Sequence, residues 1–255
     1  PPARPGAAPT VSLSGSLIST LSFTDSNLGN ILVKEGSIND SVFSGISFLT
    51  TIFSDDMGNI TISGSHPSLT SLTLDGLSLN QIKVGSIEAV YENLTDLTIS
   101  NVIASKIIIG EREVDISNGT AFDLTNVACD TSINLYGENA DFSGLQDITI
   151  TNVSASGITI GHMNEDFSAV TKIICNNLDI DGLTISGSSD FTLLEVIVLK
   201  DVASVSASIY PGIATFDLYI EDCTFTNLYL NSGYQKVYLP QTDLTTWPFY
   251  DYVTG

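Results

Sequence analysis

The sequence predicts an all-β fold, a parallel β-solenoid (β-helix) of about nine coils of about 25 residues each, with three short strands per coil. Three observations predict it. An apolar pattern recurs with a nearly constant period, each copy alternates as strands do, and a turn-forming residue occupies one fixed position in almost every copy. A leucine-rich-repeat solenoid is the alternative fold.

The repeat is defined by apolar residues at offsets 0, 2, 5, 7, 10 and 12. The copy that runs from Leu97 to Ile109 fills all six offsets. Nine copies open at Leu21, Ile46, Leu72, Leu97, Phe122, Ile148, Ile173, Ile197 and Leu218, at intervals of 21 to 26 residues. The copy near Ile46 is irregular, with its last strand expected at Ile60 and Ile62, and the copy at Phe122 carries one extra residue.

Within a copy, each apolar-x-apolar pair predicts a short strand whose two apolar side chains point to the same side. The two residues between successive pairs interrupt the alternation, so the chain is expected to turn there. A single coil cannot bury its apolar side, and parallel stacking at about 4.8 Å per coil would join all the pairs into one continuous core.

The first corner of each coil carries Gly, Asn or Asp, the residues that most readily adopt a left-handed backbone. These residues are Asp25, Gly76, Asn101, Asn126, Asn152, Asn177, Asp201 and Asp222. We expect the stacked Asn side chains to bond to one another along the axis. The rest of each coil predicts a loop or a short helical turn that covers the core, with an aromatic residue three positions ahead of an aliphatic one, as in Phe142 and Leu145.

The six-offset pattern and the Asn column resemble right-handed parallel β-helices, in which Asn ladders recur at a turn. Strings such as Leu69-x-x-Leu72-x-Leu74 also resemble the leucine-rich repeats of bacterial surface proteins. The third apolar pair, Ile107-x-Ile109, has a strand period where those repeats usually turn helical, which favours the β-helix. The resemblance is architectural and indicates no single family.

The same pattern divides the chain into three parts. Residues 1–14 predict a linker or terminal tract, residues 15–232 the solenoid repeats, and residues 233–255 an aromatic-rich C-terminal cap or a junction to a neighbouring domain or chain. A solenoid end exposes strand edges, which is why a cap is expected there.

The charge of the chain excludes some partners. It has 29 acidic and 8 basic residues, a net charge of −21. Nucleic acid is disfavoured because phosphate binding needs a surface rich in Lys and Arg. No run of 18 apolar residues exists, so no transmembrane segment is predicted. A repeat architecture that is rich in Ser, Thr, Asn and Asp and poor in Lys predicts a secreted or cell-surface location.

The three cysteines are predicted to be buried, reduced thiols. Cys129, Cys175 and Cys223 occupy inward offsets and lie two coils apart, so neighbours are separated by about 10 Å along the axis. A disulfide needs Cα atoms within about 7 Å.

The outward positions give the candidate binding surfaces. Hydroxyl side chains form a ribbon along the first strand, including Thr73, Thr98, Thr149 and Thr151. Aromatic residues gather near the C-terminal end, where Trp247, Tyr250 and Tyr252 are further candidates. These features predict a binding or adhesion module that recognises a glycan or a protein receptor on a surface.

Two alternatives stay open. A carbohydrate-active β-helix enzyme, a lyase or hydrolase, would use acids near Asp179 and Asp181. These two residues flank the inward Ile180, so their carboxylates share the outer face. The same two carboxylates are candidates for calcium, the one cofactor that the sequence suggests. An ice-binding solenoid is the second alternative, because the Thr ribbon is flat and regular over most of its length. The sequence assigns no catalytic residue.

Overall fold

The computed structural model describes residues 10–13, 17–24, 27–28, 30–33, 37–44, 47–48, 59–62, 71–76, 78–85, 87–186, 188–212, 215–230 and 234–238. These residues contain seventeen β-strands and no helix. The strands are β1 (Thr10–Leu13), β2 (Leu17–Thr24), β3 (Asn27–Leu28), β4 (Asn30–Val33), β5 (Ser37–Ser44), β6 (Ser47–Phe48), β7 (Asn59–Ile62), β8 (Ser71–Asp75), β9 (Ser78–Val84), β10 (Asp96–Ile109), β11 (Ala121–Leu135), β12 (Asp147–Ile160), β13 (Lys172–Ile185), β14 (Val196–Ile209), β15 (Phe216–Glu221), β16 (Thr224–Leu230) and β17 (Tyr234–Tyr238).

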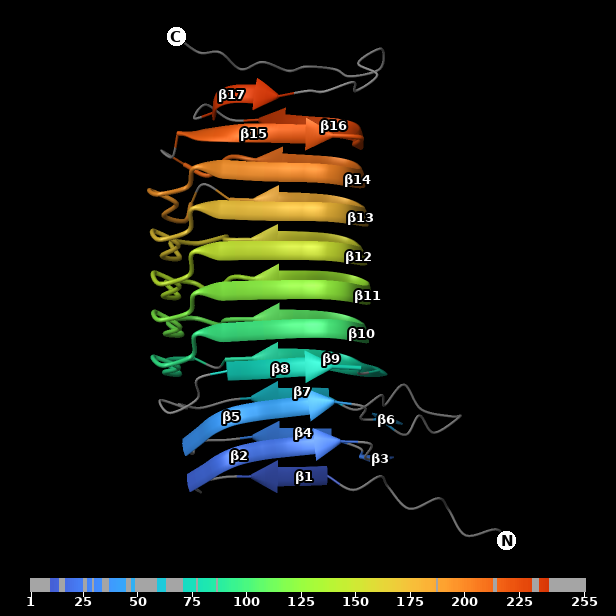
Figure 1. Ribbon diagram of the computed structural model, residues 1–255, viewed down its shortest axis with the longest axis vertical. Coiled ribbons are helices and arrows are strands. Elements are labelled where there is room, and N and C mark those ends of the chain that lie inside the picture. Colours follow the sequence, from blue (N-terminus) through green and yellow to red (C-terminus); the bar gives the residue numbers. More distant parts are fainter. Residues whose placement is uncertain are drawn as a thin grey trace, which may run out of the picture.

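The strands wind into a β-solenoid, as the sequence predicts. Every pairing between strands is parallel and joins one turn to the next. With the N-terminal turns at the bottom, the near strands run to the right and the far strands run back to the left as the chain rises (Figure 1). That path is a right-handed winding. The described residues therefore confirm the β-helix prediction, and the strand at Ile107–Ile109 rules out the helical segment that a leucine-rich repeat would place there.

The core is a set of stacked aliphatic columns. Ile99, Ile150 and Leu199 occupy one column in direct register, and each is at most 1% exposed. The second and third pairs of β10, Val102 with Ala104 and Ile107 with Ile109, are buried in the same way. Burying one such aliphatic side chain stabilises the fold by about 1.5–3 kcal/mol, so the repeat pattern is the principal source of stability.

The three strands predicted per coil are joined in the regular turns. Each of β10 to β14 is one bent strand of 14 or 15 residues that carries all three inward pairs. The extra residue of β11 falls in a bulge between Cys129 and Ser132, where the register with β12 shifts. A bulge absorbs one residue without moving the columns on either side.

The N-terminal turns differ from the predicted spacing. The copy expected to open at Ile46 instead stacks through Ser41, which pairs with Leu21 below and Leu72 above. The intervals there are therefore 20 and 31 residues, and the apolar-x-apolar rule missed the turn because Ser41 is polar. Its last strand does contain Ile60 and Ile62, as expected. About six turns are regular, so the coil count differs slightly from the nine predicted.

The first corner is held by a ladder of amide groups. Gly76, Asn101, Asn126, Asn152, Asn177, Asp201 and Asp222 all have φ between 51° and 63°, in the left-handed region. The side-chain amide of each Asn donates to the Asn one turn below, at 2.8–3.0 Å. At the lower end of this ladder Asn101 donates to Asp75. Both roles of Asn, the backbone conformation and the axial hydrogen bond, were predicted from the sequence.

The loops stack along one side of the solenoid (Figure 1). In each, a backbone N–H donates to the carbonyl three residues earlier, as Leu145 does to Phe142. The rings of Phe142, Phe167 and Phe191 stack at 4.8 and 5.0 Å between centroids. These turns cover the core as predicted. In four of the loops an aspartate accepts a hydrogen bond from the backbone N–H two residues later, and these residues are Asp115, Asp141, Asp166 and Asp190.

The three cysteines are buried and free, as the sequence predicts. Burial raises the pKa of the Cys175 thiol to about 12 and that of Cys223 to about 11. Raised pKa values leave little thiolate at neutral pH, so these side chains act as small apolar groups.

We predict that glycine is tolerated better than alanine at Asn126. Either substitution removes two ladder hydrogen bonds, at a cost of about 1–2 kcal/mol. Alanine also places a Cβ in the left-handed region, which costs about 1 kcal/mol more. Urea unfolding followed by circular dichroism measures both losses. At Ser154, an exposed strand position, the order should reverse because glycine weakens strands. Equal losses for Asn126→Gly and Asn126→Ala would contradict the conformational role.

Candidate binding face

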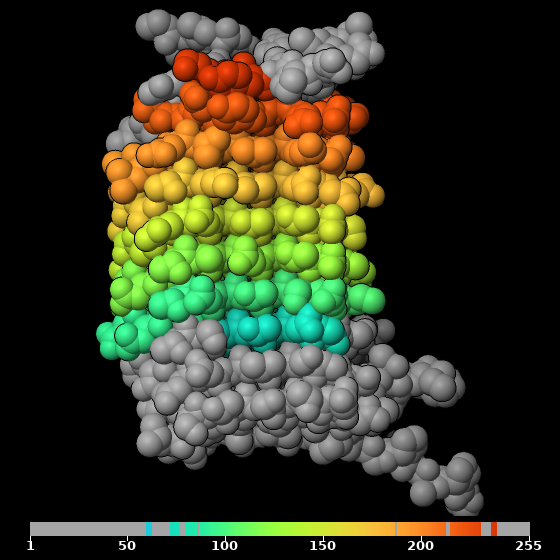
Figure 2. All heavy atoms as spheres, viewed as in Figure 1, coloured from blue at the N-terminus to red at the C-terminus, as the bar shows by residue number. Residues whose placement is uncertain are grey.

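The first strand segment of every turn presents one outer surface, which we call the ribbon face. Its central column runs in register through Thr73, Thr98, Asp123, Thr149, Ile174, Val198, Tyr219 and Tyr238. Two flanking columns lie beside it, because residues two positions away along a strand point to the same side. The near side of the molecule in Figure 2 is level, with side chains aligned in rows from turn to turn.

The N-terminal half of the ribbon face, from β8 to β12, carries hydroxyls and acids. Thr73, Thr98 and Thr149 lie half-buried in the central column, and Thr151 lies half-buried in a flanking one. Asp123 interrupts the Thr column. The flanking columns add Asp75, Asp96 and Asp147. The structure thus aligns three of the four predicted threonines in one column, which is not uniformly Thr because Asp123 interrupts it.

The C-terminal half, from β13 to β17, has a different chemistry. Ile174, Val198, Tyr219 and Tyr238 continue the central column, and the two tyrosine rings stack at 4.3 Å between centroids. Three of the eight bases in the chain flank this column. They are Lys172, Lys200 and Lys236. Apolar, aromatic and basic side chains therefore meet on one surface of a strongly acidic protein.

Local interactions hold this half in place. The Nζ of Lys200 lies 3.0 Å from Oε1 of Glu221, and this hydrogen bond raises the pKa of the lysine. Loss of hydration, together with the neighbouring Tyr238, raises the pKa of Tyr219. Tyr219 is still 37% exposed. Because the two rings stack on each other, a ligand would meet their edges and their hydroxyl groups.

The predicted calcium ligands lie on a different surface. Asp179 and Asp181 are exposed on the second strand segment, on either side of buried Ile180. Within the described ranges, no three His, Cys, Asp or Glu side chains gather closely enough to hold a metal ion. Asp130 lies in the bulge of β11 between Cys129 and Ser132, where the register with β12 shifts. Calcium binding at Asp179 and Asp181 stays a prediction.

The aromatic C-terminal candidates, Trp247, Tyr250 and Tyr252, lie outside the described residues. The same holds for most of the segment that the sequence assigns to a cap or junction. Only Tyr234–Tyr238 of that segment is described, and it adds a further parallel strand, β17, to the solenoid.

A buried carboxylate stands out on the loop side of the solenoid. Glu165 is 1% exposed, at the loop position where neighbouring turns place Val114, Ala140 and Ser189. Its oxygens accept hydrogen bonds from the backbone N–H groups of residues 137, 162 and 163, at 2.7–3.1 Å. The hydroxyl of Ser189 donates a fourth, at 2.5 Å. A buried carboxylate whose oxygens accept four hydrogen bonds is typical of a structural role.

We predict that Glu165→Ala destabilises the protein although alanine occupies the same position in a neighbouring turn. The substitution leaves three backbone N–H groups without their acceptor, which costs about 2–4 kcal/mol in free energy of unfolding. Ser189→Ala, which removes one donor, is the matched control and should cost about 1 kcal/mol. Thermal and urea unfolding measure both. A Glu165→Ala variant as stable as the parent would show that water replaces the carboxylate.

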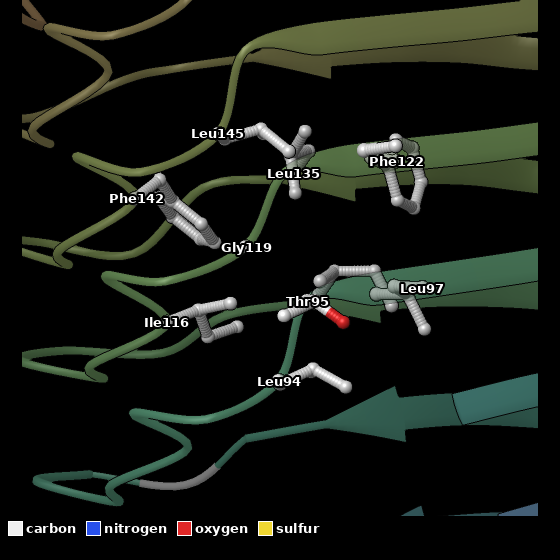
Figure 3. A pocket seen from close by; sticks show the side chains of 11 residues that line it. Leu94, Thr95, Leu97, Ile116, Gly119, Phe122, Leu135, Phe142 and Leu145 are labelled. Carbon is white, nitrogen blue, oxygen red and sulfur yellow. The ribbon is translucent and has the colours of Figure 1, made fainter. Parts of the chain in front are cut away.

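A small apolar cavity lies between the turns of β10 and β11. Its volume is about 20 Å³, and it is lined by Leu94, Phe122, Phe142 and other apolar residues (Figure 3). The cavity adjoins Ile116, which holds the position that Tyr91, Phe142, Phe167 and Phe191 fill in other loops. The smaller side chain leaves the gap. The space suits about one methyl group, so we assign it no ligand.

We predict that Ile116→Phe raises the free energy of unfolding by up to about 1 kcal/mol, because the larger ring extends the aromatic column into the cavity. Ile116→Ala enlarges the cavity and should cost about 2–5 kcal/mol. Ile150→Phe, at a filled core position, is the control and should cost about 1–3 kcal/mol through overpacking. A loss for Ile116→Phe as large as for Ile150→Phe would contradict the packing described here.

Sequence reasoning missed several of these features. Lys172 and Lys236 of the ribbon face could have been found, since each lies at an outward offset next to an apolar residue of the repeat. The pairing of Tyr219 with Tyr238 could not, because β17 follows β15 after only 19 residues. Glu165 gave no signal, since a loop glutamate is ordinarily exposed.

No family model matches the chain, and neither the curated proteins nor the solved structures compared with it give a match. Among the described residues, no helix has the length and apolar character of a membrane span.

Proposed function

We propose that the protein is a secreted or cell-surface binding or adhesion module that recognises a glycan or a protein receptor through its ribbon face. The observation that carries the proposal is that the inward side chains stay constant from turn to turn, whereas the outward side chains change. The inward residues of β10 to β14 repeat the same aliphatic pattern, whereas the outward residues of the ribbon face change from hydroxyl and acid to apolar, aromatic and basic between β8 and β17.

The chemistry of the C-terminal half supports a recognition role. Tyr is enriched where proteins bind other molecules, because its ring supplies apolar area and its hydroxyl supplies a hydrogen bond. Tyr219 and Tyr238 lie next to Val198 and to the Lys200–Glu221 pair. Polar groups around an exposed aromatic centre are the arrangement that binding hot spots use.

The rigidity of the scaffold also supports it. The ribbon face rests on buried aliphatic columns and on hydrogen-bonded parallel strands, so its side chains are fixed relative to one another over many turns. A preorganised surface loses little entropy on binding. This favours recognition of an extended ligand, such as a glycan chain or the flat surface of a receptor.

A screen of glycan and protein arrays with the purified chain tests the proposal. We expect binding, and we expect the double substitution Tyr219→Ala with Tyr238→Ala to weaken it at least tenfold. Tyr229→Ala is the matched control, because Tyr229 is 49% exposed on the third strand segment and lies off the ribbon face. Its binding should match that of the parent.

Two outcomes would overturn the proposal. The first is the absence of any array ligand whose binding depends on Tyr219 and Tyr238. The second is polysaccharide cleavage that Asp179→Asn and Asp181→Asn abolish, which would establish the carbohydrate-active enzyme instead.

A further inference from the structure

We propose that the ribbon face also binds a second copy of this chain, with the two solenoids antiparallel. The inference rests on the proposed function, since it names one partner for the same face. It starts from the uneven charge of that face. Among the described residues, the outward positions of β8 to β12 on this face include four acids and no base. They are Asp75, Asp96, Asp123 and Asp147.

The other half of the face is the complement. The outward positions of β13, β14, β15 and β17 include Lys172, Lys200 and Lys236 together with Asp217 and Glu221. Lys200 and Glu221 neutralise each other as an ion pair. This half therefore has a small net positive charge in a chain of net charge −21, and it carries the apolar central column.

Two-fold symmetry brings unlike halves together. In a symmetric dimer the same patch lies on both sides of the interface. An axis that runs along the strands, between β12 and β13, reverses the order of the turns in one copy. Asp147 of each copy then faces Lys172 of the other, and Ala121 faces Val196. Parallel solenoids would instead place the acidic half of one copy on the acidic half of the other.

The shape and size of the face suit a weak dimer. The surface is level and its side chains are aligned in rows (Figure 2), as sheet-on-sheet packing requires. Eight turns of about 4.8 Å and five residues of about 3.3 Å give about 600 Å² per copy. The total of about 1,200 Å² is the lower end of the range for specific interfaces. The same symmetry sets Asp96 against Asp217, so we expect micromolar affinity or weaker.

Charge exchange between separate variants gives the sharpest test. Sedimentation velocity over a range of concentrations, at about 0.15 M salt, should show the parent chain in reversible monomer–dimer equilibrium. Lys172→Glu alone sets acid against acid across the interface, and Asp147→Lys alone sets lysine against lysine. Each variant should raise the dimer dissociation constant about tenfold or more, because opposed like charges suppress association.

An equimolar mixture of the two variants should dimerise again, to within about threefold of the parent affinity. In the mixed dimer one contact joins Asp147 to Lys172, and the other joins the glutamate introduced at position 172 to the lysine introduced at position 147, so both of these pairs are of opposite sign. An effect of either substitution within its own chain cannot produce this recovery. Lys106→Glu, on the third strand segment, is the control and should leave the equilibrium unchanged.

Three results would overturn the inference. They are a chain that stays monomeric up to about 0.5 mM, variants that dimerise as the parent does, and a mixture that fails to recover. Circular dichroism of each variant shows whether it is folded. A monomeric chain that still binds array ligands through Tyr219 and Tyr238 would refute self-association and leave the proposed function standing.

Discussion

The axial register between turns is the constraint on which the structure depends. Each inward aliphatic pair lies above its counterpart in the previous turn, as Ile150 lies between Leu124 and Cys175, so the backbone hydrogen bonds and the core packing impose the same alignment. A parallel sheet buried on one side gains from every turn that is added. The Asn ladder at the corner and the Phe stack in the loops follow the same rule, because like side chains stack on like in neighbouring turns.

That constraint leaves the outer surface free to vary. Nothing in the core requires Thr at position 149 or Tyr at position 219, since both point away from the aliphatic columns. The outward residues nevertheless sort into two halves of different chemistry along one continuous face. A solenoid separates the residues that build the fold from the residues that meet a ligand, and this separation underlies both the proposed binding function and the proposed pairing of two copies.

The fold could be predicted from the sequence largely because it is periodic. Aliphatic pairs predict the strands, and Asn101, Asn126, Asn152 and Asn177 predict the corner, since one physical requirement recurs at each turn. The prediction failed where a turn breaks the rule, as at Ser41, whose polar side chain hid the register. The candidate face was predicted only in part. Its threonines follow from strand alternation, whereas the Tyr219–Tyr238 stack depends on a shortened turn that the repeat pattern does not predict.

Repetition brings a hazard that Glu165 limits. Because the turns resemble one another, a segment of the chain could stack one turn out of register. The aliphatic columns alone would disfavour this register shift only slightly, because exchanging Ile for Val or Leu costs little stability. The carboxylate of Glu165 needs donors from the loop before it, from its own loop and from the loop after it. A chain displaced by one turn would bury that charge without them, at a cost of several kcal/mol. A single irregular side chain can thus set the order in which interchangeable windings assemble.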